Sequence, residues 1–326
     1  MNVPSSSQSA DTLAATGEFA VIAAVTAELE QPATTVLGPG DDAAIVAAPD
    51  GRQLASVDML VDGVHFRSDW ASAEQIGRRA ALAAMADVAA MGGRPTALLV
   101  AISAPGSTTM PVVTGIAAGL RQAAAENGAG VVGGDLTSSD VLTLSVTVLG
   151  DLAGAAPVLR SGARPGDIVA VTGRLGWAAA GLAVLSRGFR SPAVAVNAYR
   201  VPEPPLSQGP LAAASGATSM IDVSDGLLAD LGHIAAASGV SVDVRSAAIE
   251  VPARLAEVAS ALGKNARTWV LTGGDDHALA ATFPSGSALL PGWVKIGQVG
   301  QGTGVTVDGA DYEADPGWDH FGGPGR

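Results

Sequence analysis

Aspartates beside glycines are the residues of this chain that could do chemistry. Glycine lets the backbone turn sharply and lets a ligand approach closely. The pattern recurs along the sequence: Asp41 and Asp42 follow Gly38-Pro39-Gly40, Asp135 follows Gly133-Gly134, Asp222 and Asp225 precede Gly226, and Asp275 and Asp276 follow Gly273-Gly274. Two carboxylates about 4 Å apart repel by roughly 4 kcal/mol at an effective dielectric near 20. A cluster of these acids would therefore need divalent cations to stay ionised.

Magnesium is the cation that this composition favours. The chain has no Cys, and its histidines (65, 233, 277 and 320) lack the spacing of a zinc site. Mg²⁺ prefers carboxylate, water and phosphate oxygens. The sequence therefore predicts a magnesium site with a phosphorylated ligand.

Asp87 lies on the apolar face of a helix expected over residues 72–91. The helix is marked by a Ser72-x-x-Gln75 capping box and by Gly92-Gly93 as its end. An unpaired carboxylate on such a face is too costly to keep. It is paired with an arginine such as Arg78 or Arg79, protonated, or bound to a metal ion.

The Asp222-Val-Ser-Asp225-Gly226 segment is expected where a strand turns into a helix. Asp225 or Ser224 could cap that helix, which explains one acid. Asp222 would end the strand, where α/β sheets commonly place ligand-binding groups. Simple capping and ligand binding both stay open for this segment.

Several function classes are excluded. The charge of −13 opposes binding to nucleic acid or to an anionic membrane. The G-x-G-x-x-A match at residues 38–43 is rejected, because two carboxylates there would repel a pyrophosphate and a strand is expected to follow. No P-loop exists, and the two lysines, Lys264 and Lys295, follow no glycine loop. The uncharged run over residues 96–120 contains Pro105 and Pro111 and is expected to form a strand and a helix, not a membrane span.

The elements that position the acids alternate between strand and helix. In 326 residues, 48% of them hydrophobic, about two domains are expected. Residues 1–16 are predicted to be a flexible tail without signal-peptide features, 17–152 one domain and 153–326 a second. Helices are expected over 17–30, 72–91, 111–127, 177–186, 226–238 and 252–262, and strands over 53–60, 97–102, 168–172 and 218–223, with others near 48, 130 and 141. Together with the lack of Cys, these features favour a cytoplasmic protein.

Ten short motifs, in this order, resemble those of the thiamine-monophosphate kinase family. They begin at Gly17-Glu-Phe19 and include Gly63-Val-His65-Phe66, Arg160 to Asp167 and Trp318-Asp-His-Phe321. The other six are aspartate motifs: Gly38 to Ala43, Ser56-Val-Asp58, Ala86 to Gly92, Gly133-Gly-Asp135, Asp222 to Gly226 and Gly273 to Asp276. The family belongs to a superfamily similar to aminoimidazole ribonucleotide synthetase. The resemblance implies an α/β (α+β) fold with two domains: an N-terminal four-stranded sheet domain that binds ATP and Mg²⁺ and pairs across a homodimer, and a C-terminal domain with a mixed sheet.

The resemblance also implies roles for individual residues. The residues implied as metal ligands are Asp41, Asp42, Ser56, Val57 (through its carbonyl), Asp58, Asp87, Asp135, Asp222 and Asp225. The implied ATP contacts are Gly134, Asp135, Arg160 and Ser224, and the implied substrate contacts are His65, Asp275, Trp318 and Phe321. Many family members carry Thr at position 57 and Glu at position 275, so this chain departs from the pattern at both.

The implied activity is Mg²⁺-dependent phosphorylation of thiamine monophosphate by ATP, the last step in making thiamine diphosphate, by direct transfer without a general base or nucleophile from the protein. The alternatives are another ATP-using member, such as aminoimidazole ribonucleotide synthetase, and a non-catalytic nucleotide-binding protein. Selenophosphate synthetase and the hydrogenase-maturation homologue depend on Cys or selenocysteine, which this chain lacks.

Asp87→Asn and Asp135→Asn should each abolish Mg²⁺-dependent turnover and leave the metal-free fold intact, because each removes one negative charge from a repelling set. The check is turnover at limiting Mg²⁺ beside thermal unfolding in a chelator. Near-normal activity of either variant would show that the metal cluster is assigned wrongly.

Overall fold

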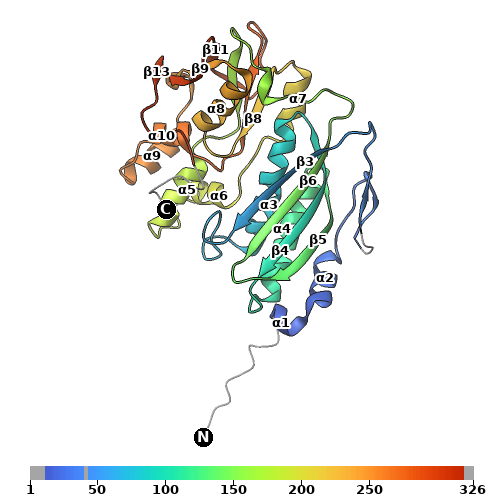
Figure 1. Cartoon of the computed structure of the whole chain (residues 1–326). Helices are drawn as coiled ribbons and strands as arrows, with labels where there is room; N and C mark the ends of the chain where they lie inside the picture. Colours follow the sequence, from blue (N-terminus) through green and yellow to red (C-terminus); the bar gives the residue numbers. More distant parts are fainter. Residues whose placement is uncertain (1–11, 40–42, 319–326) are drawn as a thin grey trace. The chain divides into compact units, whose positions relative to one another are not determined.

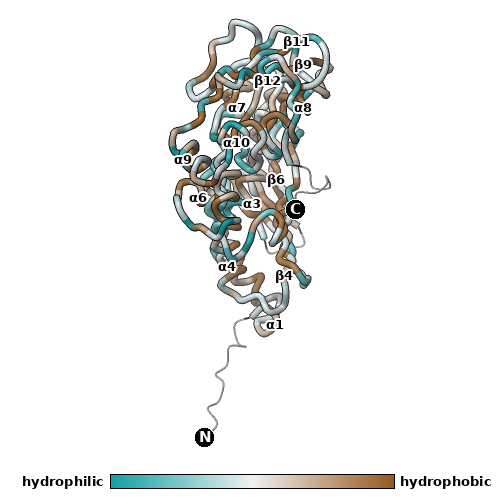
Figure 2. Tube along the Cα trace, turned by 90° about the vertical axis from the view of Figure 1, so that its left-hand side faces the viewer, coloured by the Kyte–Doolittle hydropathy of each residue, from teal (hydrophilic) through white to brown (hydrophobic). Residues whose placement is uncertain are grey.

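The computed structural model describes residues 12–39 and 43–318, and the chain divides into two compact units (Figure 1). The first unit contains residues up to 51, 55–84 and 95–149. The second contains residues 52–54, 85–94 and 150 onward. The main division lies at Leu149 and Gly150. Hydrophobic residues recur along the trace of both units (Figure 2).

A four-stranded sheet with the strand order β3-β6-β4-β5 is the centre of the first unit. Its strands are β3 (Leu54–Val61), β4 (Arg94–Ala104), β5 (Gly130–Ser138) and β6 (Thr143–Asp151). On β6, alternate residues are buried, among them Leu144, Val146 and Val148 at 0% exposure. One face of the sheet is therefore covered, and α4 (Met110–Glu126) and α3 (Ala73–Ala90) lie along it (Figure 1).

Helix α3 begins at the predicted capping box. The Gln75 Oε1 atom accepts the Ser72 N–H at 3.0 Å, and the Ser72 Oγ atom accepts the Gln75 N–H at 3.2 Å. The helix then packs on α4 through glycines. A Cβ atom at Gly77 would lie 2.0 Å from the Ile116 carbonyl oxygen, and one at Gly119 would lie 2.0 Å from that of Glu74. Only glycine allows this close backbone approach.

The rest of the first unit is small. Helices α1 (Leu13–Thr16) and α2 (Glu18–Thr26) precede a two-stranded sheet of β1 (Thr35–Leu37) and β2 (Ile45–Val46). The Thr12 side chain caps α1, and the Leu13 N–H donates to the Thr108 carbonyl. Residues 12–16, expected as part of a flexible tail, are therefore a helix with its cap.

A seven-stranded mixed sheet with the order β13-β12-β9-β11-β7-β10-β8 forms the second unit. Its strands are β7 (Ile168–Thr172), β8 (Ser219–Val223), β9 (Ser241–Val244), β10 (Ala278–Phe283), β11 (Val294–Gly300), β12 (Gly304–Val307) and β13 (Ala310–Asp311). The β12–β9 pair is parallel and the other neighbours are antiparallel. Every residue of β7, β8 and β10 is buried, so these strands form the core of the unit.

The helices of this unit are α5 (Trp177–Ser186), α6 (Ala193–Arg200), α7 (Gln208–Ala214), α8 (Leu227–Ser238), α9 (Ala253–Ala261) and α10 (Ala266–Thr272), with 3₁₀ turns at Arg160–Gly162 and Ser246–Ala248. The predicted α/β fold, with an N-terminal four-stranded sheet and a C-terminal mixed sheet, is confirmed. No helix in the described part of the chain is long and apolar enough to cross a bilayer.

Gly77→Ala and Gly119→Ala should each lower the free energy of unfolding by about 1–3 kcal/mol, because the added methyl group overpacks the α3–α4 contact. The matched control is Gly232→Ala in α8, where nothing lies within 4 Å of the added Cβ atom. This control should stabilise the protein by up to about 1 kcal/mol. Urea unfolding curves of the three variants check the prediction, and equal effects of all three would contradict it.

Candidate functional site

The end of β8 and the loop that follows it carry three of the predicted site residues, Asp222, Ser224 and Asp225. Asp222 is 3% exposed at the end of the buried strand. Its Oδ2 atom lies 3.0 Å from the Nδ1 atom of His277. Gly226 follows with φ of 136°, a value that L side chains rarely adopt, and a Cβ atom there would lie 2.6 Å from the Thr272 carbonyl oxygen.

The Gly273–His277 segment before β10 is fastened to this loop. The Asp275 N–H donates to the Ser224 carbonyl at 2.8 Å, and the His277 N–H donates to the Val223 carbonyl at 2.9 Å. A Cβ atom at Gly274 would lie 2.4 Å from the Ser224 carbonyl oxygen, so the two backbones touch. The structure thereby brings Asp275 beside Ser224 and Asp225.

Trp318 reaches the same loop from the C-terminal segment. The backbone N–H of Trp318 donates to the Asp225 carbonyl at 2.9 Å, and the residue is 49% exposed. A Cβ atom at Gly317 would lie 2.6 Å from the same carbonyl oxygen. Three segments that are far apart in the sequence therefore meet at residues 222–225.

Capping by Asp225 or Ser224 is not how α8 begins. Its N-cap residue, Gly226, has no side-chain cap, and the Asp230 Oδ2 atom accepts the N–H groups of Asp225 and Gly226 at 3.1 and 3.0 Å. Burial, together with the nearby carboxylates of Asp222 and Asp225, raises the pKa of Asp230 to about 7, against the lowering effect of the two N–H donors. Asp230 was missed from the sequence, although its position in the first turn of the helix is a signal.

Asp225, Asp230 and His233 form a group that could hold a metal ion. One ligand atom of each lies within 4.8 Å of the others, which makes this the one group of three or more such residues among those the structure describes. The sequence argument included Asp225 alone. The Asp230-x-x-His233 spacing, which puts both side chains on one face of a helix, could have indicated the other two.

Asp276 has a structural role that the sequence analysis did not predict. It is 5% exposed, and its carboxylate accepts the N–H groups of Gly176 and Ala178 at the start of α5. Burial raises the pKa of Asp276 to about 7, while these two hydrogen bonds act in the opposite direction. The adjacent Asp275 and His277 have φ of 65° and 51°, in the left-handed region.

The predicted site residues of the first unit lie on different strands. Ser56, Val57 and Asp58 are on β3, and Gly134 and Asp135 are on β5. These are the two edge strands, with β6 and β4 between them. At about 4.8 Å per strand spacing, the two edge strands that carry Asp58 and Asp135 are roughly 14 Å apart in the sheet of one chain.

The two strands also differ in the face that they offer. On β3, Val57 and Met59 are 60% and 59% exposed and lie on one face. Ser56 and Asp58 lie on the opposite face, together with the buried Leu60. Asp135 pairs with Ala101, which is exposed and lies on the same face of β4 as the exposed Leu99. Asp135 is therefore on the open face of the sheet. Within one chain the sheet does not bring these acids together.

His65 follows β3 in a tight turn. Its Nδ1 atom accepts the Val61 N–H at 3.0 Å. The hydrogen-bonded neutral ring therefore carries its proton on Nε2. In that tautomer the unprotonated nitrogen, Nδ1, already accepts the Val61 N–H, which opposes a role as a proton acceptor for a substrate.

Asp87 is half-buried on α3. Of the two arginines considered as its partners, Arg78 pairs instead with Glu126 through two hydrogen bonds of 3.0 and 2.8 Å. Arg160 is exposed in the first 3₁₀ turn, and its carbonyl accepts the Ser238 hydroxyl. Asp41, Asp42 and Phe321 lie outside the described residues.

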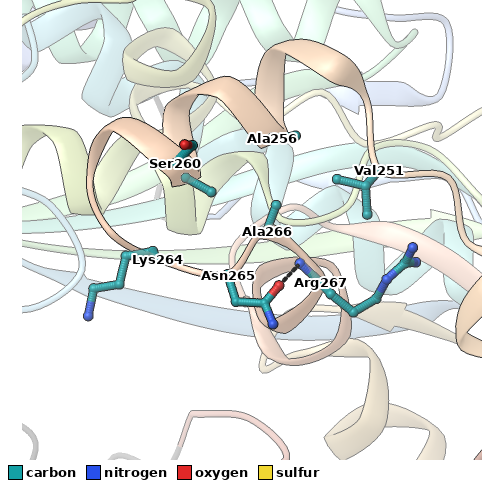
Figure 3. A pocket seen from close by; sticks show the side chains of 8 residues that line it. Val251, Ala256, Ser260, Lys264, Asn265, Ala266 and Arg267 are labelled. Carbon is teal, nitrogen blue, oxygen red and sulfur yellow. Dashed lines mark hydrogen bonds between the residues drawn. The ribbon is translucent and has the colours of Figure 1, made fainter.

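An open hollow of about 490 Å³ lies elsewhere on the second unit, beside α9 and the start of α10 (Figure 3). Lys264 and Arg267 line it, but the Arg267 Nη1 atom donates to the carbonyls of Ser246 and Ile249. None of the predicted site residues lines this hollow.

Comparisons with known proteins show the family of this chain. The family model "AIR synthase related protein, N-terminal domain" matches residues 40–152. A thiamine-monophosphate kinase of Mycobacterium tuberculosis is 48% identical over 315 residues, which cover 96% of this chain and 94% of that one. The chain belongs to the thiamine-monophosphate kinase family. The Corynebacterium glutamicum member is 42% identical over 333 residues, with 98% of each chain covered.

Solved structures of this family have the same fold. Thiamine-monophosphate kinase from Stenotrophomonas maltophilia has a TM-score of 0.77 at 31% identity and covers 90% of this chain and 95% of its own. AaThiL complexed with AMPPCP and TMP has a TM-score of 0.79 at 29% identity, with 94% and 97% covered. The suspected family membership is thereby confirmed.

Asp276→Asn should change how stability depends on pH. Because the folded-state pKa of Asp276, about 7, lies above the ordinary 3.8, the folded protein keeps this proton where the unfolded chain has lost it. The stability that this group contributes therefore falls as the pH rises from about 4 to 7. Asn does not titrate, so the variant should gain stability relative to the parent protein across that range, by on the order of 1–4 kcal/mol.

Urea unfolding at pH 5 and pH 8 measures this difference. The exposed control Asp311→Asn should follow the parent protein at both values. A stability difference between Asp276→Asn and the parent that is the same at both pH values would contradict the prediction.

Proposed function

We propose that this protein transfers the γ-phosphoryl group of ATP to thiamine monophosphate, giving ADP and thiamine diphosphate. The family membership supports a kinase, and AaThiL complexed with AMPPCP and TMP supports the two substrates. The observation that carries the proposal is the meeting of residues 222–225, Gly273–His277 and Trp318, because the family's acidic and aromatic motifs converge there.

Several Mg²⁺ ions are part of the proposal, and the donors present fit them. They are all oxygen ligands, and the Asp222 Oδ1 atom accepts no hydrogen bond from any residue that the structure describes, although Oδ2 does. When bound, Mg²⁺ would neutralise charge between the two phosphate groups. Asp58, Asp87, Asp135, Asp222 and Asp225 would hold these ions, together with Asp41, Asp42, Ser56 and the Val57 carbonyl.

Direct transfer without a protein base follows from the acceptor. The second pKa of a phosphate monoester is about 6, so its attacking oxygen is already mostly ionised at neutral pH. The protein's task is then to align two anionic groups and to exclude water. The bound Nδ1 atom of His65 and the absence of Cys from the sequence support this mechanism.

The remaining residues would recognise the ligands. Ser224, Arg160 and the Gly134 backbone would contact ATP. His65, Asp275 and Phe321 would contact the thiamine part of the acceptor, and the exposed indole of Trp318 is suited to a cationic thiazolium ring.

A homodimer formed through the first unit is also proposed. Val57, Met59 and Leu99 are exposed apolar residues on its four-stranded sheet, and a second copy would cover them. A cytoplasmic location rests on the absence of Cys and fits a protein that uses ATP.

The proposed activity is tested by incubating the protein with ATP, Mg²⁺ and thiamine monophosphate and separating the products. ADP and thiamine diphosphate should form in equal amounts, and excess EDTA should stop both. ATP binding without product would favour the non-catalytic alternative. Turnover with formylglycinamidine ribonucleotide and not with thiamine monophosphate would favour the aminoimidazole ribonucleotide synthetase alternative.

Trp318→Ala should raise the KM for thiamine monophosphate about 2- to 30-fold and leave the KM for ATP nearly unchanged, because a cation–π contact contributes roughly 0.5–2 kcal/mol. Steady-state kinetics with each substrate varied in turn measure the two constants. Trp318→Phe is the matched control and should retain most of the affinity. Equal changes in both constants would favour a role for Trp318 in packing alone.

A further inference from the structure

His277 has a buried side chain that contacts a predicted metal ligand. The side chains of His277 and Asp222 are 9% and 5% exposed, and the Nδ1–Oδ2 distance is 3.0 Å. In a pair with an ionised carboxylate, which can only accept a hydrogen bond, the imidazole donates through its Nδ1–H group. His277 therefore fixes one of the two carboxylate oxygens of Asp222.

The backbone determines this contact as well. Strands β8 and β10 are antiparallel, with Asp222 opposite Leu279. His277 comes two residues before Leu279, so it lies diagonally across from Asp222 on the same face of the sheet. The His277 N–H donates to the Val223 carbonyl, and the φ of 51° lies in the left-handed region. A non-glycine residue held there needs support from its surroundings, and the buried hydrogen bond provides it.

We propose that His277 is a positioning residue, which orients the Asp222 carboxylate so that Oδ1 is directed to a bound Mg²⁺ ion. This inference rests on the proposed function, because it takes Asp222 to be a metal ligand. Hydrogen-bond partners of ligating side chains typically contribute 10–100-fold to metal affinity. His277 touches neither substrate nor ion in this proposal.

Two substitutions distinguish the effect of the side-chain hydrogen bond from the effect of the left-handed backbone at position 277. His277→Asn keeps an N–H donor close to the position of Nδ1, and Asn tolerates the left-handed region. His277→Gly also tolerates this backbone conformation and removes the donor. Phe283→Leu, at the other end of β10, is a control for reduced stability at a distance from Asp222.

The experiment measures Mn²⁺ binding by electron paramagnetic resonance with saturating AMPPCP, so turnover is not required. Asp222→Asn identifies the class of ions that depends on Asp222. For that class, His277→Gly should bind 10–100-fold more weakly than the parent protein, whereas His277→Asn and Phe283→Leu should stay within about fivefold. Unchanged affinity in a folded His277→Gly variant would overturn the proposal.

A second measurement does not require the glycine variant to fold. In the parent protein labelled with ¹⁵N-histidine, the His277 signal, identified by its loss in His277→Asn, should show the proton on Nδ1 and should shift when Mg²⁺ is added. A proton on Nε2, or no response to Mg²⁺, would overturn the inference.

If Asp222→Asn binds Mn²⁺ like the parent protein, Asp222 is not a ligand and the metal part of the proposed function also fails. A parent protein that forms thiamine diphosphate while His277→Gly keeps full Mn²⁺ affinity would contradict the inference alone.

Discussion

The backbone contact between the loop after β8 and the segment before β10 is the constraint on which the acidic site of the second unit depends. In a chain of charge −13 with two lysines, cationic side chains are too few to hold every acid in place. The Val223 and Ser224 carbonyls instead accept N–H groups from His277 and Asp275, and Gly274 permits the approach. Neutral backbone donors therefore fix the geometry of these loops without cationic side chains.

Asp230 and Asp276 are also held by backbone N–H groups, which donate to their carboxylates. Each is buried, and each accepts two backbone N–H groups at the start of a helix, α8 for Asp230 and α5 for Asp276. Burial raises the pKa of both to about 7. These two acids therefore hold the loops that present Asp225 and Asp275, and adjacent aspartates in one motif have separate roles.

The sequence was sufficient wherever the signal was local. The capping box placed the start of α3, and the predicted ranges 168–172 and 177–186 are those of β7 and α5. It was insufficient where backbone geometry or strand order decides. The left-handed φ values at Asp275 and His277 are one example, because no periodicity in the sequence reveals them. Helices α6, α7 and α10, each of seven or eight residues, are too short for a clear helical pattern and were missed.

Strand order also limits how the first unit can bind cations. Two oxygens on one Mg²⁺ ion are at most about 4.2 Å apart, twice the usual metal–oxygen distance. Asp58 and Asp135 lie on opposite edge strands of the sheet, roughly 14 Å apart. They also lie on different faces, so the two carboxylates of one chain cannot share an ion. If both bind Mg²⁺, they bind different ions, so the strand order excludes a single ion shared by these two acids of one chain.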